Sequence, residues 1–258
     1  MAQHKAIPLS LIAGVAYYAV CVLTSVVSQI HVDRYIKYSL HHASVNGEIE
    51  SIHLPDIGFY HLPDYSHSNI VDDLLMPSYI STILLITMAS ANRFFLIKRF
   101  VAINGTAFLA RSISIFITLM PKSNKQLPND SVINTTLEET LREAGMMITL
   151  NKKSVNDMMF SGHTSIVLTM MLCIMHAEIF NRLPKPELIK SIIVSAAVTI
   201  FIGIITTRMH YTVDVYISCL ITFLLYACYM LAVRNAHHLR DNREKQSAYD
   251  RFLNWYDN

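Results

Sequence analysis

Residues 158–177 read MMFSGHTSIVLTMMLCIMHA, twenty consecutive positions without Asp, Glu, Lys or Arg. A helix of about 20 apolar residues crosses the roughly 30 Å hydrocarbon layer of a bilayer, so this stretch predicts a transmembrane span. The rest of the chain is similar, because 52% of its 258 residues are hydrophobic and only 16% are charged. A soluble domain carries about 25% charged residues. The sequence therefore predicts an all-α polytopic membrane protein.

Composition also excludes several classes of protein. The formal net charge is only +2 and no stretch is strongly basic, so we expect no nucleic-acid partner. The high apolar content excludes a disordered chain, and four cysteines are too few for a disulfide scaffold. All four cysteines fall in apolar blocks, which leaves the loops without an obvious disulfide.

The uncharged or nearly uncharged blocks predict six spans in one domain over residues 1–258. We place them at approximately 7–30, 75–92, 100–121, 159–178, 190–207 and 213–233. Buried helices of a large soluble protein are the main alternative, but six such blocks leave too little polar cover. The first block is too long for the core of a cleaved signal peptide, so we interpret it as a retained signal anchor. Residues 235–258 are expected to form a solvated cytosolic tail.

The charges of the connections predict an orientation. The short connection 92–100 carries three cations and no acid, whereas the loop 31–73 carries seven acids and two cations. By the positive-inside rule both termini are expected to be cytosolic. The loops 31–73 and 122–157 then face the lumen or the cell exterior, where the sequons at Asn129 and Asn134 give weak further support.

Two polar motifs stand where spans 4 and 6 begin. In Phe160-Ser161-Gly162-His163-Thr164, Ser161 is suited to cap the helix and Gly162 admits a close neighbour. The unpaired amides of that first turn favour an anion such as phosphate. In His210-Tyr211-Thr212-Val213-Asp214, the histidine and the acid lie at i and i+4, on one helical face. The acid can therefore orient the imidazole and stabilise its charged form.

Spans 4 and 6 run in the same direction, so the two motifs are expected at one membrane depth. Two histidines and an acid around an anion site favour phosphoryl transfer through a phosphohistidine. One histidine attacks phosphorus and the other supplies a proton to the leaving oxygen. For either histidine alone, an interfacial residue wetted by headgroups is an equally good interpretation; the matched pair with Asp214 favours catalysis.

Together, Ser161-Gly162-His163 and His210-x-x-x-Asp214 resemble the paired motifs of the type 2 phosphatidic acid phosphatase superfamily. The sequences at 160–164 and 210–215 are similar to its sphingomyelin synthase branch, which includes inositol- and ethanolamine-phosphorylceramide synthases. Two further segments resemble motifs of that branch: 54–59 (LPDIGF) and, across span 3, the set Lys98, Arg99, Gly105, Thr106, Arg111, Thr118 and Pro121. One departure is that Val155-Asn156-Asp157 stands where the family usually has Cys-Gly-Asp.

The resemblance implies a six-helix bundle of the superfamily type, with a catalytic region over 155–215, and it implies residue roles. His210, oriented by Asp214, would attack the phosphorus of a glycerophospholipid and release diacylglycerol. His163 would protonate the departing oxygen and then deprotonate the primary hydroxyl of ceramide. Further contacts to the substrate are expected from a second group of residues: Asp157, Ser161, Gly162, Arg111, Arg208 and Asp56.

For two of these residues the sequence leaves the role open. Arg111 lies midway in span 3, where a cation is expensive, and it could face the phosphate or form a structural ion pair. Arg208 could also contact the headgroup, but snorkelling to water explains it slightly better.

The expected activity is transfer of phosphocholine, phosphoethanolamine or phosphoinositol to ceramide, without metal or cofactor. The superfamily's lipid phosphatases share a Lys-x6-Arg-Pro motif, and this chain has no Arg-Pro pair. A lipid phosphatase remains the enzymatic alternative, and a non-catalytic ceramide-binding protein is the other. The resemblance further implies a Golgi or plasma-membrane location with a lumenal or extracellular active site; a homo-oligomer stays open.

Overall fold

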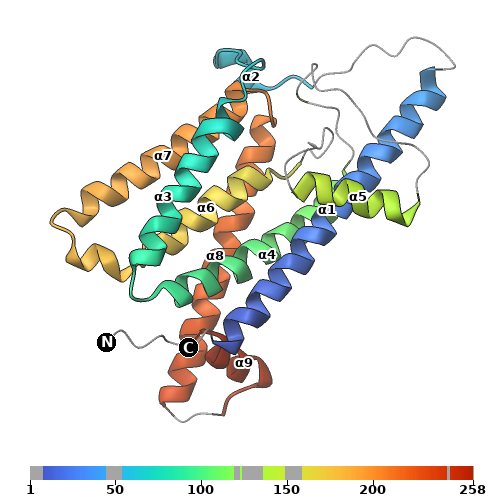
Figure 1. The fold of residues 1–258 in the computed structure, drawn as a ribbon. Helices are drawn as coiled ribbons and strands as arrows, with labels where there is room; N and C mark the ends of the chain where they lie inside the picture. Colours follow the sequence, from blue (N-terminus) through green and yellow to red (C-terminus); the bar gives the residue numbers. More distant parts are fainter. Residues whose placement is uncertain are drawn as a thin grey trace.

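The computed structural model describes residues 8–44, 54–118, 123, 136–148, 159–242 and 245–257. In these residues every regular element is a helix, as expected (Figure 1). The long helices are α1 (Leu9–Ser44), α4 (Arg93–Ile117), α7 (Pro186–Thr206) and α8 (Thr212–Asp241). The π-helical turn η1 (Val71–Leu75) leads directly into α3 (Met76–Ala89). The shorter helices are α2 (Ile57–His61), α5 (Leu137–Ile148), α6 (Gly162–Ile174), η2 (Glu178–Arg182) and α9 (Ala248–Asp257).

Among the residues that the structure describes, five helices are long and apolar enough to cross a bilayer: α1, η1 with α3, α4, α7 and α8. The protein is therefore an integral membrane protein. The expected count of six full spans is not confirmed, because α6 has 13 residues and is roughly 20 Å long. Large apolar side chains stay exposed on these helices, among them Ile12, Leu85, Ile192 and Phe223, as lipid-facing surfaces require.

The short helix α6 lies at the centre of the bundle and contacts α3, α4, α7 and α8 (Figure 1). Polar side chains fix its position. Ser165 accepts a hydrogen bond from Asn104 of α4 at 3.1 Å and another from Thr222 of α8 at 3.2 Å. Small polar residues of this kind allow close helix packing where the lipid gives no hydrophobic driving force. The centre of the fold thus holds the helix that carries the first motif.

Several boundaries differ from the sequence expectation. Helix α1 continues past residue 30 and ends at Ser44. In this extension Arg34 forms a buried ion pair with Glu143 of α5 at 2.6 Å. Helix α8 continues to Asp241. The final segment is not a solvated tail, since α9 packs on the bundle and buries Leu253, Tyr256 and Asp257. Asp257 pairs with Arg99 of α4 at 2.9 Å, which explains why an amphipathic ending docks rather than extends into water.

Candidate active site

The first motif forms the N-terminus of α6. Ser161 is the N-cap, and its Oγ accepts hydrogen bonds from the Thr164 amide (3.2 Å) and the Thr164 hydroxyl (2.9 Å). The Ser161 amide donates to Oγ of Ser218 in α8 at 2.6 Å. Gly162 and His163 supply the remaining first-turn amides, which are the groups of a helix N-terminus that can meet an anion.

The second motif forms the N-terminus of α8, and Asp214 joins it to the first. The Asp214 side chain is fully buried. Its Oδ1 accepts from the amide of Met159, just before α6, at 2.9 Å, and its Oδ2 accepts from the amide of Tyr211 at 3.1 Å. Met159 has a positive φ of 85°, an uncommon conformation for a non-glycine residue. One carboxylate therefore fixes the approach to both helices.

The two histidines come together as the paired motifs require. Their ring centroids are 6.4 Å apart, with the planes tilted by 59°. His210 is buried, and its Nδ1 lies 3.5 Å from Oδ2 of Asp214. That separation is within ion-pair range but too long and misaligned for a hydrogen bond, and Nδ1 has no hydrogen-bond partner among the described residues. The His163 side chain is 36% exposed, so it forms the accessible side of the pair.

A further acid, which sequence reasoning missed, lies against His163. Oδ1 of Asp72, in η1, is 3.1 Å from Nε2 of His163. The pair Asp72-Asp73 directly precedes the uncharged block that begins at Leu74. An acid held at the rim of a span is costly, and that cost was a usable signal. From the sequence alone, these acids contributed only to the predicted orientation, because their distance from His163 depends on the fold.

Arg111 lies behind the first motif. Its Nε donates to the carbonyl oxygen of Phe160 at 3.0 Å, and one Nη donates to Oγ of Ser25 at 3.1 Å. A Cβ added to Gly162 would lie 3.4 Å from the Arg111 guanidinium carbon. A Cβ there would thus meet the guanidinium at ordinary van der Waals distance. A buried cation supporting the anion-binding turn is compatible with both roles that the sequence left open.

Asp56 and Arg208 hold the loop that covers the start of α8. Asp56 caps α2 and accepts hydrogen bonds from the amide (2.8 Å) and hydroxyl (2.5 Å) of Thr212. Arg208, at a positive φ of 57°, donates to the carbonyl oxygen of Phe59 at 3.0 Å and packs over its ring. Hydrogen bonds from Ser66 and the nearby Arg208 cation lower the pKa of Asp64, which faces this guanidinium. Asp56 and Arg208 thus both form hydrogen bonds within the protein.

The remaining predicted site residue, Asp157, lies outside the described residues, as do Val155, Asn156 and both sequons. The structure brings together His163, His210, Asp214, Ser161 and Gly162, with Arg111 behind them. Asp56 and Arg208 are connected to this group through the loop at Phe59 and the start of α8.

Comparison with known proteins finds similarity over the segment that carries both motifs. The family model described as "PAP2 superfamily C-terminal" matches residues 155–231, which include both histidine motifs. Over these residues the chain is similar to the PAP2 superfamily. It is also 30% identical over 166 residues to sphingomyelin synthase-related protein 1 of Mus musculus. That alignment covers 60% of this chain and 33% of the mouse protein, so the match spans about a third of that relative's length.

These comparisons confirm the resemblance to the sphingomyelin synthase branch of the PAP2 superfamily. The PAP2 match begins at residue 155, so the loop 54–59, the acid Asp72 and Arg111 fall outside it. The resemblance had already linked 54–59 and Arg111 to the motifs, whereas the contact of Asp72 with His163 is a finding of the tertiary structure.

Proposed function

We propose that this protein transfers a phospho-alcohol headgroup from a glycerophospholipid to ceramide and releases diacylglycerol. The observation that carries the proposal is the pair of histidines, whose ring centroids are 6.4 Å apart. Asp72 lies beside His163, and Asp214 lies beside His210. A single histidine and acid would suffice to form an intermediate. Two such pairs, one buried and one accessible, suit a reaction with two successive proton transfers to and from bulky alcohols.

In the first half-reaction, the nitrogen of His210 that faces away from Asp214 attacks phosphorus. The bond from phosphorus to the glycerol oxygen breaks, and His163 gives that oxygen its proton. Asp214 stabilises the charge that develops on His210, as a carboxylate does beside a catalytic histidine. The first-turn amides of α6, supported by Arg111, would hold the phosphoryl oxygens.

In the second half-reaction, the primary hydroxyl of ceramide attacks the phosphohistidine. His163 takes the hydroxyl proton, and the bond from phosphorus to His210 breaks. The group that acted as acid in the first half acts as base in the second. Asp72 supports this exchange because it holds one nitrogen of His163 and leaves the other for the substrate. We name Asp72 a positioning residue.

Among the described residues, the small number of cations near the α6 turn favours transfer from a phosphodiester over hydrolysis of a phosphate monoester. A phosphodiester carries one negative charge and needs fewer cations than a dianionic monoester. Arg208 donates to the carbonyl oxygen of Phe59 and faces Asp64, whereas Arg111 donates to the carbonyl oxygen of Phe160, directly before the α6 turn. Together with the missing Arg-Pro pair, this supports a phosphodiester donor. We place the reaction on the lumenal or exoplasmic side of a Golgi or plasma membrane.

The proposal is tested with the purified full chain in liposomes containing labelled ceramide and phosphatidylcholine, phosphatidylethanolamine or phosphatidylinositol in turn. We expect a ceramide product in at least one donor series, and the donor that gives it identifies the headgroup. His210→Ala should abolish transfer, whereas His238→Ala, at an exposed position far along α8, should leave it within about twofold. Full transfer by His210→Ala would disprove the mechanism. Free phosphate from phosphatidic acid would indicate a phosphatase, and ceramide binding without product a non-catalytic protein.

A further inference from the structure

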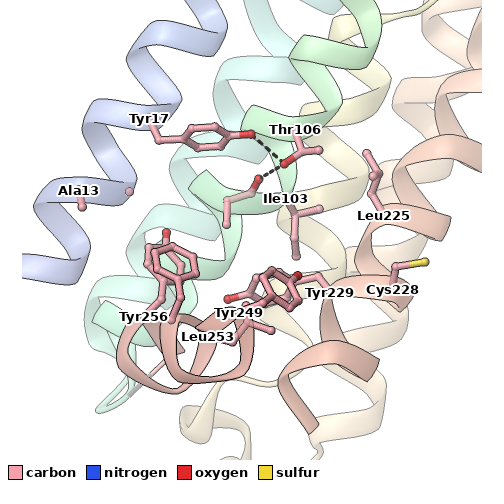
Figure 2. Close-up of a pocket in the computed structure, with 13 residues that line it drawn as sticks. Ala13, Tyr17, Ile103, Thr106, Leu225, Cys228, Tyr229, Tyr249, Leu253 and Tyr256 are labelled. Atoms are coloured by element: carbon pink, nitrogen blue, oxygen red, sulfur yellow. Dashed lines mark hydrogen bonds between the residues drawn. The ribbon is translucent and has the colours of Figure 1, made fainter. Parts of the chain in front are cut away.

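A pocket lies at the other end of the bundle from the histidines. It is a cavity of about 620 Å³ between α1, α4, α8 and α9 (Figure 2). Its volume falls in the range of small-molecule sites, roughly 300–1,000 Å³. Cys228 of its wall is fourteen residues past Asp214 on α8, or roughly 21 Å along the helix axis. The cavity is therefore not part of the candidate active site.

The walls of the cavity offer little to a polar ligand. The Tyr17 hydroxyl is hydrogen-bonded to Oγ1 of Thr106 at 3.0 Å (Figure 2), and that oxygen donates to the carbonyl of Ala102 at 2.8 Å. The Tyr256 hydroxyl donates to the carbonyl oxygen of Lys98 at 2.9 Å, and that of Tyr229 donates to Asp257 at 3.1 Å. These four hydroxyls are satisfied by the protein, so most of the wall presents aromatic and aliphatic carbon; the exposed Tyr249 and Cys228 also line it.

The surroundings of the cavity determine what can fill it. Three of its walls are helices that span the bilayer, and Ala13, Thr106 and Cys228 on them remain exposed. An apolar cavity excludes water and accepts hydrocarbon, because only hydrocarbon restores the missing dispersion contacts. At this depth the abundant hydrocarbon is the acyl chain of the lipids themselves. Helix α9, fixed by its ion pair with Arg99, closes the end of the space.

We propose that this cavity binds one hydrocarbon chain of a membrane lipid from the leaflet opposite the histidine pair. The occupant would connect α1, α4 and α8 to α9, which otherwise meet around an incompletely filled core. The site is independent of the proposed reaction, because it lies at the opposite end of the bundle from His163 and His210.

The chain's single tryptophan provides a test. Trp255 lies on α9, with its ring centroid 5.8 Å from that of Phe252 in the cavity wall. Phosphatidylcholine with brominated acyl chains is titrated into the full chain in detergent, and Trp255 fluorescence is recorded. We expect quenching that saturates at one lipid per chain. Ala13→Phe, which fills the cavity, should weaken the affinity for the brominated lipid at least tenfold. Ala16→Phe, which is exposed on the same helix but outside the cavity, should leave that affinity unchanged.

Identical titrations of the two variants, or quenching without saturation, would overturn the proposal. A second measurement uses the unmodified sequence and so does not depend on how a variant folds. Phosphatidylcholine with a diazirine near the end of one acyl chain is photolysed with the protein, and adducts are mapped by mass spectrometry. We expect adducts at Leu225 and Phe252 of the cavity. Adducts spread evenly over exposed residues of α7 would contradict the site.

Discussion

At the scale of single residues, Asp214 combines a structural and a chemical role. Its buried carboxylate accepts hydrogen bonds from the amides of Met159 and Tyr211 and also faces His210. Losing a hydrogen bond to a buried carboxylate costs about 1–3 kcal/mol, because the donor left behind is desolvated without a partner.

Asp214→Asn should therefore lower both stability and activity. The new amide group would place N–H donors against one of the two backbone amides, so we expect a loss of about 1–3 kcal/mol in the free energy of unfolding. Removing the charge beside His210 should lower kcat by roughly 10²- to 10⁴-fold. Thermal unfolding and liposome transfer measure the two effects. Wild-type kcat in a folded variant would remove Asp214 from the mechanism.

Asp72 differs from Asp214 because it acts only through His163. Asp72→Asn should lower kcat about tenfold, which corresponds to about 1.4 kcal/mol, while KM stays within twofold. Asp72→Glu should restore part of the rate, since it returns a carboxylate near Nε2. The matched control is Asp73→Asn, the neighbouring exposed acid, which should behave like the wild type. Equal effects of the two substitutions would show a general charge effect instead.

At the scale of elements, helix α2 depends on a glycine to approach α8. A Cβ at Gly58 would overlap Oγ1 of Thr212 and crowd Ile205. The Thr212 hydroxyl is itself held by Asp56, so it cannot move aside without losing that bond.

Gly58→Ala should consequently displace the loop that covers the start of α8. Overpacking of this kind costs about 1–3 kcal/mol, and we expect a lower melting temperature together with reduced transfer. Gly145→Ala on α5 is the control, because a Cβ there meets nothing within 4 Å. It should be neutral or stabilising by up to about 1 kcal/mol. A stable, fully active Gly58→Ala would show that the loop is not needed.

The docking of α9 depends on a buried ion pair. Breaking such a pair from one side costs about 3–5 kcal/mol, because the other charge stays buried without compensation. Asp257→Ala should release α9 from Arg99, shift Trp255 emission to the red and speed proteolysis between α8 and α9. Arg251→Ala, exposed on the same helix, should change none of these. Unchanged emission in Asp257→Ala would show that the other contacts of α9, such as the hydrogen bond from Tyr256 to Lys98, hold it without the ion pair.

At the scale of the whole molecule, the bundle places the reaction and the lipid cavity at opposite ends. Helices α6 and α8 both begin at the end that carries α2, whereas α1 begins beside α9 (Figure 1). Which end faces the cytosol remains the expectation from loop charge.

Glycosylation tests that orientation. If the loop 122–157 is lumenal, the protein made in eukaryotic cells should carry glycans at Asn129 or Asn134 and lose mass on treatment with an N-glycosidase. The double variant Asn129→Gln, Asn134→Gln should show no such shift. A new sequon engineered into the 92–100 connection should stay unmodified, and its modification would reverse the orientation.

The sequence by itself determined the membrane class and the two motifs, because bilayer cost and helix periodicity act locally, and the motifs carried the resemblance to the PAP2 superfamily. It also predicted that His163 and His210 share one depth, since spans 4 and 6 start on one side. Only the tertiary structure decided what faces them. The contact of Asp72 with His163, the support of the α6 turn by Arg111 and the docking of α9 on Arg99 join residues far apart in the chain. Hydropathy contains no information on such pairings; the packing of α6 among its neighbours sets them.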